Sequence, residues 1–467
     1  MRSFSRVALA LGATLLPLSG CQFIRPVPQQ DARTMSAVTA STGEDIAFRS
    51  KAGPVDESDA RPGGTLTLSD AVKLALSNDA RIQAALSRVR MAQAEALQTR
   101  LLPNPIVSVA FRFPDTGSTI IEASLAQEFL SLLTKPGRIS AADNRLRAES
   151  AAAVVEVLDV VAEVKERYAA IQALEALTPV LKERQRLVTR LLELANARLK
   201  AGEGTRLDVT TVDAQRVEIE VEIAEKEREL RSERLALTRL IGQPSGAATW
   251  PVTSFEEPVA LATREADWVA TALEHRPEIA ARRWELAALG IEARLTRFAP
   301  FEGSGVGVDS ERDDGWSVGP SLSAPLPLFD WGQGQRAKAL AARTAAGHAL
   351  TQARREVVQE ARQAHGDYAA SLSALRRVRT ELVPLEESRR SQAEAAYKAG
   401  QADITSLIIA DQELQAARAK LIELQQRVSE SLARLERAAG GPARVPPPQQ
   451  PTTNSATSSQ ASADTQN

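Results

Sequence analysis

Most of the chain repeats apolar residues at helical spacing, in stretches much longer than the helices of ordinary globular domains. The pattern predicts helices over residues 137–201 and 335–399, each followed by a glycine turn and a further helix, to Ile241 and over 404–438. A helix of roughly 64 residues at about 1.5 Å each spans nearly 100 Å, which favours an extended coiled coil over a compact core. The clearest heptad positions in the last helix are Leu407, Leu414, Leu421, Val428 and Leu435.

Four short segments interrupt this helical pattern and alternate in polarity instead. They lie near residues 106–113, 119–127, 303–309 and 316–325. One apolar face and one small polar face is typical of a strand with lipid on one side and water on the other. Each segment is also about as long as a tilted membrane crossing. The candidate membrane-facing residues are Val107, Val109, Phe111 and Phe113 in the first segment and Trp316 and Val318 in the fourth.

Four strands are too few to close a barrel around a water-filled lumen. Lipid does not tolerate open strand edges, because their backbone groups find no hydrogen-bond partner there. If these segments cross a membrane, several copies of the chain must therefore assemble, each contributing four strands. No run of eighteen apolar residues follows the N-terminal segment, so no membrane-spanning helix is expected.

The two halves of the chain repeat each other at an offset of 197 residues. Residues 75–82 align with 272–279, Pro103 falls on Pro300, and Gly137 falls on Gly334. This pattern predicts a tandem duplication. The first helix–strand–strand–helix–helix repeat covers 65–242, a linker covers 243–263, and the second repeat covers 264–440.

Each repeat opens with a shorter helix, from caps near Thr67 to about Leu102 in the first and over 264–298 in the second. Together with the helix after the glycine turn, it matches the length of one long helix. We therefore expect two shorter helices to stack end to end beside each long one, as in the wall of a tube.

The first twenty residues have the features of a signal peptide. Arg2 and Arg6 precede an apolar stretch, and Leu18-Ser19-Gly20-Cys21 closes it. The segment resembles a bacterial lipobox, which implies that Cys21 is lipid-modified and becomes the mature N-terminus. Gln22 follows it in place of the Asp that implies inner-membrane retention, so an outer-membrane, lipid-anchored protein extending into the periplasm is favoured. The alternative is an ordinary secretory signal with a chance cysteine.

Composition and the remaining segments fit this interpretation. Residues 21–64 form a tether with several prolines and no lasting periodicity, and 441–467 read as a disordered tail. The chain carries 57 basic and 59 acidic side chains and loses two basic ones with the leader. It is thus mildly acidic, without the basic field that nucleic-acid binding requires.

No pattern of a catalytic, cofactor-binding or metal site is found. The three histidines, His275, His348 and His365, do not pair at ligand spacing, and the single cysteine excludes an internal disulfide. The many carboxylates alternate with Arg or Lys along helices, as exposed ion pairs do. The sequence predicts a protein that is not an enzyme and holds no cofactor or metal.

Taken together, the duplicated order of elements resembles the TolC family of outer-membrane efflux channels over about residues 65–440. The motifs that carry the resemblance are Pro103-Asn104-Pro105, the segment 325–330 (PLPLFD), and the turns at Gly202 and Gly400. It implies a mainly α fold with a small β portion. Three copies would complete a long-helix α-barrel and a transmembrane β-barrel of four strands per chain. It also implies a periplasmic adaptor protein and an inner-membrane pump of the RND type as partners, besides outer-membrane lipid.

The resemblance assigns the two helix turns to a periplasmic tip that contacts the adaptor. The second turn lacks an Asp at the position where some members build an acidic constriction, although Asp403 and Asp411 lie nearby. The null alternative for such charges is a solvated helix face. The residues assigned to adaptor contact are Arg198, Leu199, Gly202, Asp208, Tyr397, Gly400 and Asp403.

Two other classes of protein remain as alternatives: a periplasmic coiled-coil adaptor and a structural lipoprotein without a pore. The tandem duplication and the four strands favour the channel. The sequence does not identify the exported solute, metal cation or drug. The proline motif and the segment 325–330 resemble the heavy-metal branch of the family.

Overall fold

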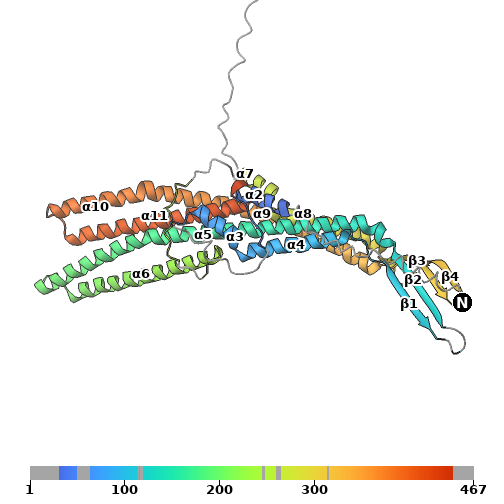
Figure 1. Cartoon of the computed structure of the whole chain (residues 1–467). Helices are drawn as coiled ribbons and strands as arrows, with labels where there is room; N and C mark the ends of the chain where they lie inside the picture. The colour runs from blue at the N-terminus through green and yellow to red at the C-terminus, as the bar shows by residue number, and fades with distance from the viewer. Residues whose placement is uncertain are drawn as a thin grey trace, which may run out of the picture.

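The computed structural model describes residues 31–49, 64–113, 115, 119–244, 248–258, 264–312 and 315–444. Within them the molecule is long and narrow, with a small sheet at one end and two helical hairpins at the other (Figure 1). The helices are α2 (Asp31–Thr42), α3 (Leu68–Asn78), α4 (Ala80–Arg100), α5 (Leu130–Ala201), α6 (Arg206–Leu240), α7 (Glu265–His275), α8 (Pro277–Leu295), α9 (Gln333–Arg377), α10 (Val383–Lys398) and α11 (Ile404–Ala439). The strands are β1 (Ile106–Arg112), β2 (Ile120–Glu128), β3 (Gly305–Arg312) and β4 (Trp316–Ser323).

The four strands form one antiparallel sheet in the order β1-β2-β3-β4. The helices beside the sheet pack in the matching order α4, α5, α8, α9. Toward the other end the order becomes α6, α5, α11, α10. The chain therefore forms one continuous wall with the same two outer columns, β1–α4–α6 and β4–α9–α10.

The predicted end-to-end stacking of shorter helices is confirmed. In the first repeat, α6 ends against the junction of α3 and α4, where Asn78 Nδ2 donates to the Ile241 carbonyl at 2.9 Å. In the second, Gly440 at the end of α11 has φ of +99° and lies against the His275 carbonyl, so that a Cβ would stand 3.0 Å from that oxygen. Both junctions lie at mid-length of the wall, a region that we call the equator.

The main core lies at the equator of the first repeat. Side chains of α2 and α3 cover one side of α5, where Val157, Val161 and Val164 are buried. Tyr168 is fully buried among them, and its hydroxyl donates to the Leu66 carbonyl at 2.8 Å. The Thr253 amide donates to the same hydroxyl oxygen at 3.1 Å. Tyr168 thereby fixes the segment before α3 to the linker between the repeats, which Leu66 and Val252 also join by a parallel bridge.

The four strands and the long helices agree with the sequence prediction. On α11, the heptad residues Leu414, Val428 and Leu435 are buried. The long helix of the first repeat is longer than predicted, because it begins at Leu130 and reaches 72 residues with Pro136 and Pro179 inside it. The long helix of the second repeat contains one π-helical turn, Val378–Leu382, just before Pro384.

Two other predictions were wrong in detail. The opening helix of each repeat is broken in two, at Asp79 and at Arg276, whose backbones are extended. Asp79 then caps α4 by accepting from the Arg81 amide, and Pro277 begins α8. The predicted tether contains a helix, α2, which packs on α5 and is part of the core.

The leader, Cys21 and the tail beyond residue 444 lie outside the described residues. Their lipid modification and disorder stay predictions.

Replacing Tyr168 by Phe should lower the free energy of unfolding by about 1–3 kcal/mol, because the buried Leu66 carbonyl and Thr253 amide lose their partner. The measurement is the thermal unfolding midpoint in detergent. Tyr397→Phe at the exposed tip is the control and should leave the midpoint unchanged. Equal midpoints for all three proteins would contradict the role assigned to Tyr168.

Candidate functional site

The sheet separates apolar and polar residues on its two faces. In the observed register Val109 pairs with Ala123, Leu125 with Val308, and Arg312 with Trp316. Because paired residues share a face, most of the large apolar side chains of the four strands fall on one side, together with Gln127, Ser310 and Arg312. Ile106 and Ile120 fall on the other side. The large members of the apolar face are exposed in the single chain: Val107, Val109, Phe111, Leu125, Val306, Val308, Trp316, Val318 and Leu322.

The opposite face of the sheet is small and polar. It carries a hollow of about 470 Å³ lined by Ser108, Glu122, Ser124, Asp309 and Ser317, among others. Glu122 forms an ion pair with Arg112 at 2.9 Å and stands directly opposite Glu311. This face is hydrophilic, as a surface in contact with water must be.

The first tip turn joins α5 to α6 at the end of the molecule far from the sheet (Figure 1). Gly202 closes α5 with φ of +79°. Thr205 and Asp208 then form a capping box, in which the Thr205 amide donates to Asp208 at 2.8 Å. This amide hydrogen bond, with that from the Thr205 hydroxyl, lowers the pKa of Asp208. Asp208 is therefore an ionised cap, which is a structural role at the position assigned to adaptor contact.

The second tip turn joins α10 to α11 beside the first. Gly400 adopts φ of +69°, and the Asp403 carboxylate accepts from Arg198 of the first turn at 2.8 Å. Partial burial opposes the ionisation of Asp403, but the hydrogen bond from Thr405 and the charge of Arg198 outweigh it and lower its pKa. The structure thus brings Arg198 and Asp403 into contact across the two repeats.

Leu199 and Tyr397, the two remaining side chains assigned to adaptor contact, lie at the same end of the molecule and take no part in the ion pair or the capping box. Leu199 is half-buried and Tyr397 is 42% exposed. Just behind the turns, Leu187 and Leu191 of α5 pack on Ile408 of α11. This small cluster joins the two hairpins, and the exposed Tyr397 is left available to a partner.

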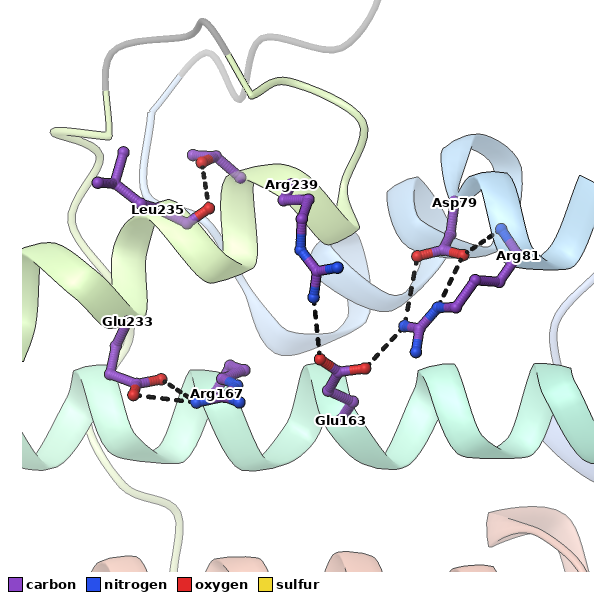
Figure 2. Close-up of polar contacts among 8 residues, drawn as sticks. Asp79, Arg81, Glu163, Arg167, Glu233, Leu235 and Arg239 are labelled. Carbon is purple, nitrogen blue, oxygen red and sulfur yellow. Dashed lines mark hydrogen bonds and ion pairs between the residues drawn. The ribbon is translucent and has the colours of Figure 1, made fainter. Parts of the chain in front are cut away.

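Ion pairs concentrate at the equator, around Glu163 of α5. Figure 2 shows Glu163 between two arginines from different elements: Arg81 of α4 at 2.7 Å and Arg239 of α6 at 3.2 Å. Arg81 also reaches Asp79, the residue that breaks the opening helix. One carboxylate therefore ties three helices at the point where α4 and α6 meet.

The second repeat builds the corresponding network at an offset of 197 residues, with opposite charges at the helix break. Arg276 stands where Asp79 does, Glu278 where Arg81 does, and Glu360 where Glu163 does. Arg276 is 5% exposed and binds both Glu278 at 2.9 Å and Glu360 at 2.7 Å.

Arg437 of α11 extends this second network to the first repeat. It binds Glu278 at 2.7 Å and Asp159 of α5 at 2.6 Å. Burial raises the pKa of Glu278, but the charges of Arg437 and Arg276 outweigh burial and the net shift is downward. Lys165 of α5 also pairs with Glu436 of α11. The sequence analysis missed these residues, although the 197-residue offset aligns Glu163 with Glu360.

No described helix has the length and apolarity that crossing a membrane requires. Among the described residues, no group of three or more His, Cys, Asp or Glu side chains lies close enough to hold a metal ion.

Comparison with known proteins identifies the class. Residues 268–441 match the model of the outer membrane efflux protein family. The outer-membrane channel OprN has the same fold, with a TM-score of 0.67 at 18% identity, covering 86% of this chain and 99% of that one. The second repeat of the chain therefore matches the outer membrane efflux protein family, and the chain as a whole has the fold of an outer-membrane efflux channel. The resemblance to TolC-type channels is thereby confirmed.

Two resistance proteins are related to the chain in sequence. The cobalt-zinc-cadmium resistance protein CzcC of Cupriavidus metallidurans is 24% identical over 387 residues, covering 81% of this chain and 90% of its own length. The fusaric acid resistance protein FusA of Burkholderia cepacia is 32% identical over 168 residues, which is 32% of this chain and 30% of that protein.

These findings support an outer-membrane efflux channel of the kind that works in tripartite pumps. The family and its structural neighbours are channels and not enzymes. The predicted fold class, mainly helical with a small four-stranded sheet, is confirmed as well.

Glu278→Gln should lower the free energy of unfolding by about 2 kcal/mol or more near neutral pH, because Arg276 and Arg437 keep buried charges and lose a partner. The exposed pair of Arg282 and Glu285 on the same helix offers a control, and Glu285→Gln should cost less than about 1 kcal/mol. Thermal unfolding in detergent measures both.

The cost of Glu278→Gln should also depend on pH. The pKa of Glu278 is lower in the folded protein than its ordinary value of 4.5. Its ionised carboxylate therefore stabilises the fold fully at pH values above 4.5, and this contribution is lost as the pH falls through the folded-state pKa. The gap between wild type and variant should therefore shrink between about pH 6 and about pH 3. A gap that stays constant or widens over this range would contradict the ion-pair account.

Val109→Arg should impair membrane insertion, because it places a charge on the apolar face of the sheet, where Arg or Lys costs about 2–4 kcal/mol at mid-membrane. Ser108→Arg is the matched control, since this neighbour lies on the polar face. Flotation with phospholipid vesicles measures insertion. Equal losses for the two variants would mean that the faces are assigned incorrectly.

Proposed function

We propose that three copies of the chain close into one continuous duct, lipid-anchored in the outer membrane through Cys21 and extending into the periplasm. In this duct β4 of one copy pairs with β1 of the next, which makes a barrel of twelve strands. The α9–α10 column of one copy meets the α4–α6 column of the next. The duct is passive, and the pump in the inner membrane supplies the energy.

The observation that carries the proposal is the pair of open edges on a wall one element thick. The backbone groups on the outer sides of β1 and β4 have no partner strand within the described chain. Such groups need partners in lipid. Apolar side chains are also exposed along the outer helices, with Val217 and Val221 on α6 and Leu385 on α10. A copy of the same wall offers both edges the partner that they require.

The tip is the proposed docking end for a periplasmic adaptor protein. Leu199 and Tyr397 would supply apolar contacts there, and the turns at Gly202 and Gly400 would fit between the adaptor's helices. Arg198, Asp208 and Asp403 hold the turns in shape through the ion pair and capping box described above. The pump beyond the adaptor would be of the RND type.

The proposed cargo is a divalent metal cation. The likeness to a cobalt-zinc-cadmium resistance protein extends over most of both chains, whereas the likeness to the fusaric acid resistance protein covers about a third of this chain. The carboxylates on the polar face of the sheet suit a cationic solute in transit.

An adaptor or a structural lipoprotein without a pore is the alternative. Neither needs a sheet with one exposed face of mostly apolar side chains. That face favours the channel.

The test uses a strain that lacks the chain and is complemented with variants. Wild type should restore tolerance to cobalt, zinc and cadmium. Tyr397→Glu should reduce tolerance severely while the purified protein remains a trimer, because the charge disrupts adaptor docking and leaves the duct intact. Ser254→Glu, an exposed site in the linker, is the control and should behave as wild type.

Restoration of fusaric acid tolerance alone would reject a metal cargo. A monomeric protein that still restores tolerance would reject the trimeric duct.

A further inference from the structure

Basic residues cluster on the helices immediately next to the sheet. They occur where α5 begins, where α8 ends and where α9 begins: Lys135, Arg138, Arg294, Arg297, Arg336 and Lys338. Over residues 130–139, 294–303 and 329–338 the acidic residues are only Glu302 and Asp330. The helix ends beside the sheet are therefore strongly positive, although the chain as a whole is slightly acidic.

Exposed apolar residues lie between this basic cluster and the sheet. On α5 these are Leu132 and Leu133, at 47% and 65% exposure, and at the end of the 3-10 helix after α8 it is Phe301, at 40%. They continue the apolar face of the strands by about one helical turn. Cations that follow directly on an apolar membrane surface lie at the level of the lipid headgroups.

The basic residues divide between the two sides of the wall. Arg138 lines a groove over α5 and α8, together with Arg145 and Glu292. A second hollow continues this groove along α5 from Arg145 and is lined by Ala152. Val161, in contrast, is buried under α2 and α3. The two residues are nine apart, which is about two and a half turns of helix, so they face opposite sides of α5. We therefore take the groove side as the lumen and the side with the added layer as the outside.

Of the six cations only Arg138 lines the groove, and three of the others lie where α5 begins and around the end of α8. Lys135 follows the exposed Leu132 by three residues and so shares its side of α5. Arg294 lies in the last turn of α8 and Arg297 in the 3-10 helix that follows it, Thr296–Phe301, and neither lines the groove. Arg297 stacks on the Phe298 ring at 4.6 Å. Neither Lys135 nor Arg294 has an ion-pair or hydrogen-bond partner among the residues that the structure describes.

We propose that Lys135, Arg294 and Arg297 form an outer collar that binds the anionic headgroups of phospholipids in the periplasmic leaflet of the outer membrane. Their charge is opposite to that of a phosphatidylglycerol headgroup, and their apolar neighbours reach the acyl chains. A trimer would repeat the collar three times around the duct. This inference rests on the proposed insertion of the sheet into the membrane.

The test reconstitutes the full-length protein into vesicles of phosphatidylcholine, alone or mixed with phosphatidylglycerol, and measures the phosphatidylglycerol retained after mild detergent extraction. Wild type should be enriched in phosphatidylglycerol. The triple variant Lys135→Gln, Arg294→Gln, Arg297→Gln should lose the enrichment, by up to roughly fivefold for each charge removed. Salt should weaken the enrichment of wild type.

Two controls separate charge from structure. Arg190→Gln, Arg228→Gln, Arg231→Gln removes the same charge from exposed positions on the tip side of the equator and should keep the enrichment. Arg294→Lys, Arg297→Lys keeps the collar's charge and should also keep it. Enrichment that survives in the first triple variant, or is absent from wild type, would overturn the collar.

Vesicle flotation distinguishes this failure from failure of the duct. Protein that floats with both vesicle types but shows no lipid preference rejects only the collar. Protein that floats with neither type rejects the membrane channel, and the collar with it.

Discussion

Away from the layer that α2 and α3 add at the equator, the chain forms a wall one element thick, and such a wall leaves both faces and both edges open. The strands β1 to β4 and the helices beside them follow the same order, so the wall is continuous from the sheet to the tip. Within the described chain, β2 and β3 are paired on both sides, whereas β1 and β4 each have one edge without a partner strand. Unpaired backbone in lipid is costly, and this cost favours the closed assembly that we propose.

The same constraint explains why α5 is so long and so well buried. A narrow wall has its main core only at the equator, and elsewhere its rigidity depends on one helix that runs past every junction. At the equator α5 carries the apolar contacts of Val157, Val164 and Tyr168 on one side. It also carries Asp159 and Glu163, whose ion pairs reach α11, α4 and α6. The places where shorter helices meet are thus tied to the one helix that does not stop there.

The duplicated network at the equator shows how a repeat can keep a geometry while exchanging its charges. Asp79 caps α4 through its side chain, and the matching Arg276 cannot. Pro277 takes over the start of α8, since its fixed φ suits the first helical position. The arginine that binds the α5 or α9 carboxylate is Arg81, two residues after the break, in the first repeat and Arg276, at the break itself, in the second. The carboxylates Glu163 and Glu360 occupy equivalent positions. The outcome in both repeats is an arginine held between two carboxylates beside the broken helix.

Much of this architecture could be predicted from the sequence, because period and offset are local signals. The alternation from Val107 to Phe111 located β1, and the heptads of α11 identified buried positions such as Leu414 and Leu435. The breaks at Asp79 and Arg276 were missed, since no glycine marks them and proline follows only the second. The contact of Arg198 with Asp403 was equally inaccessible. It joins residues far apart in sequence, whose distance depends on how the two hairpins pack.

The account stands on the claim that assembled copies enclose a water-filled path across a membrane. Single-channel recording of the purified protein in a planar lipid bilayer tests this claim most directly. The account predicts discrete conductance steps, present for trimers of wild type and of Ser108→Arg and lost for Val109→Arg. A trimer that inserts stably and yet carries no current when its tip is opened, for example by separating the pair Arg198 and Asp403, would contradict it.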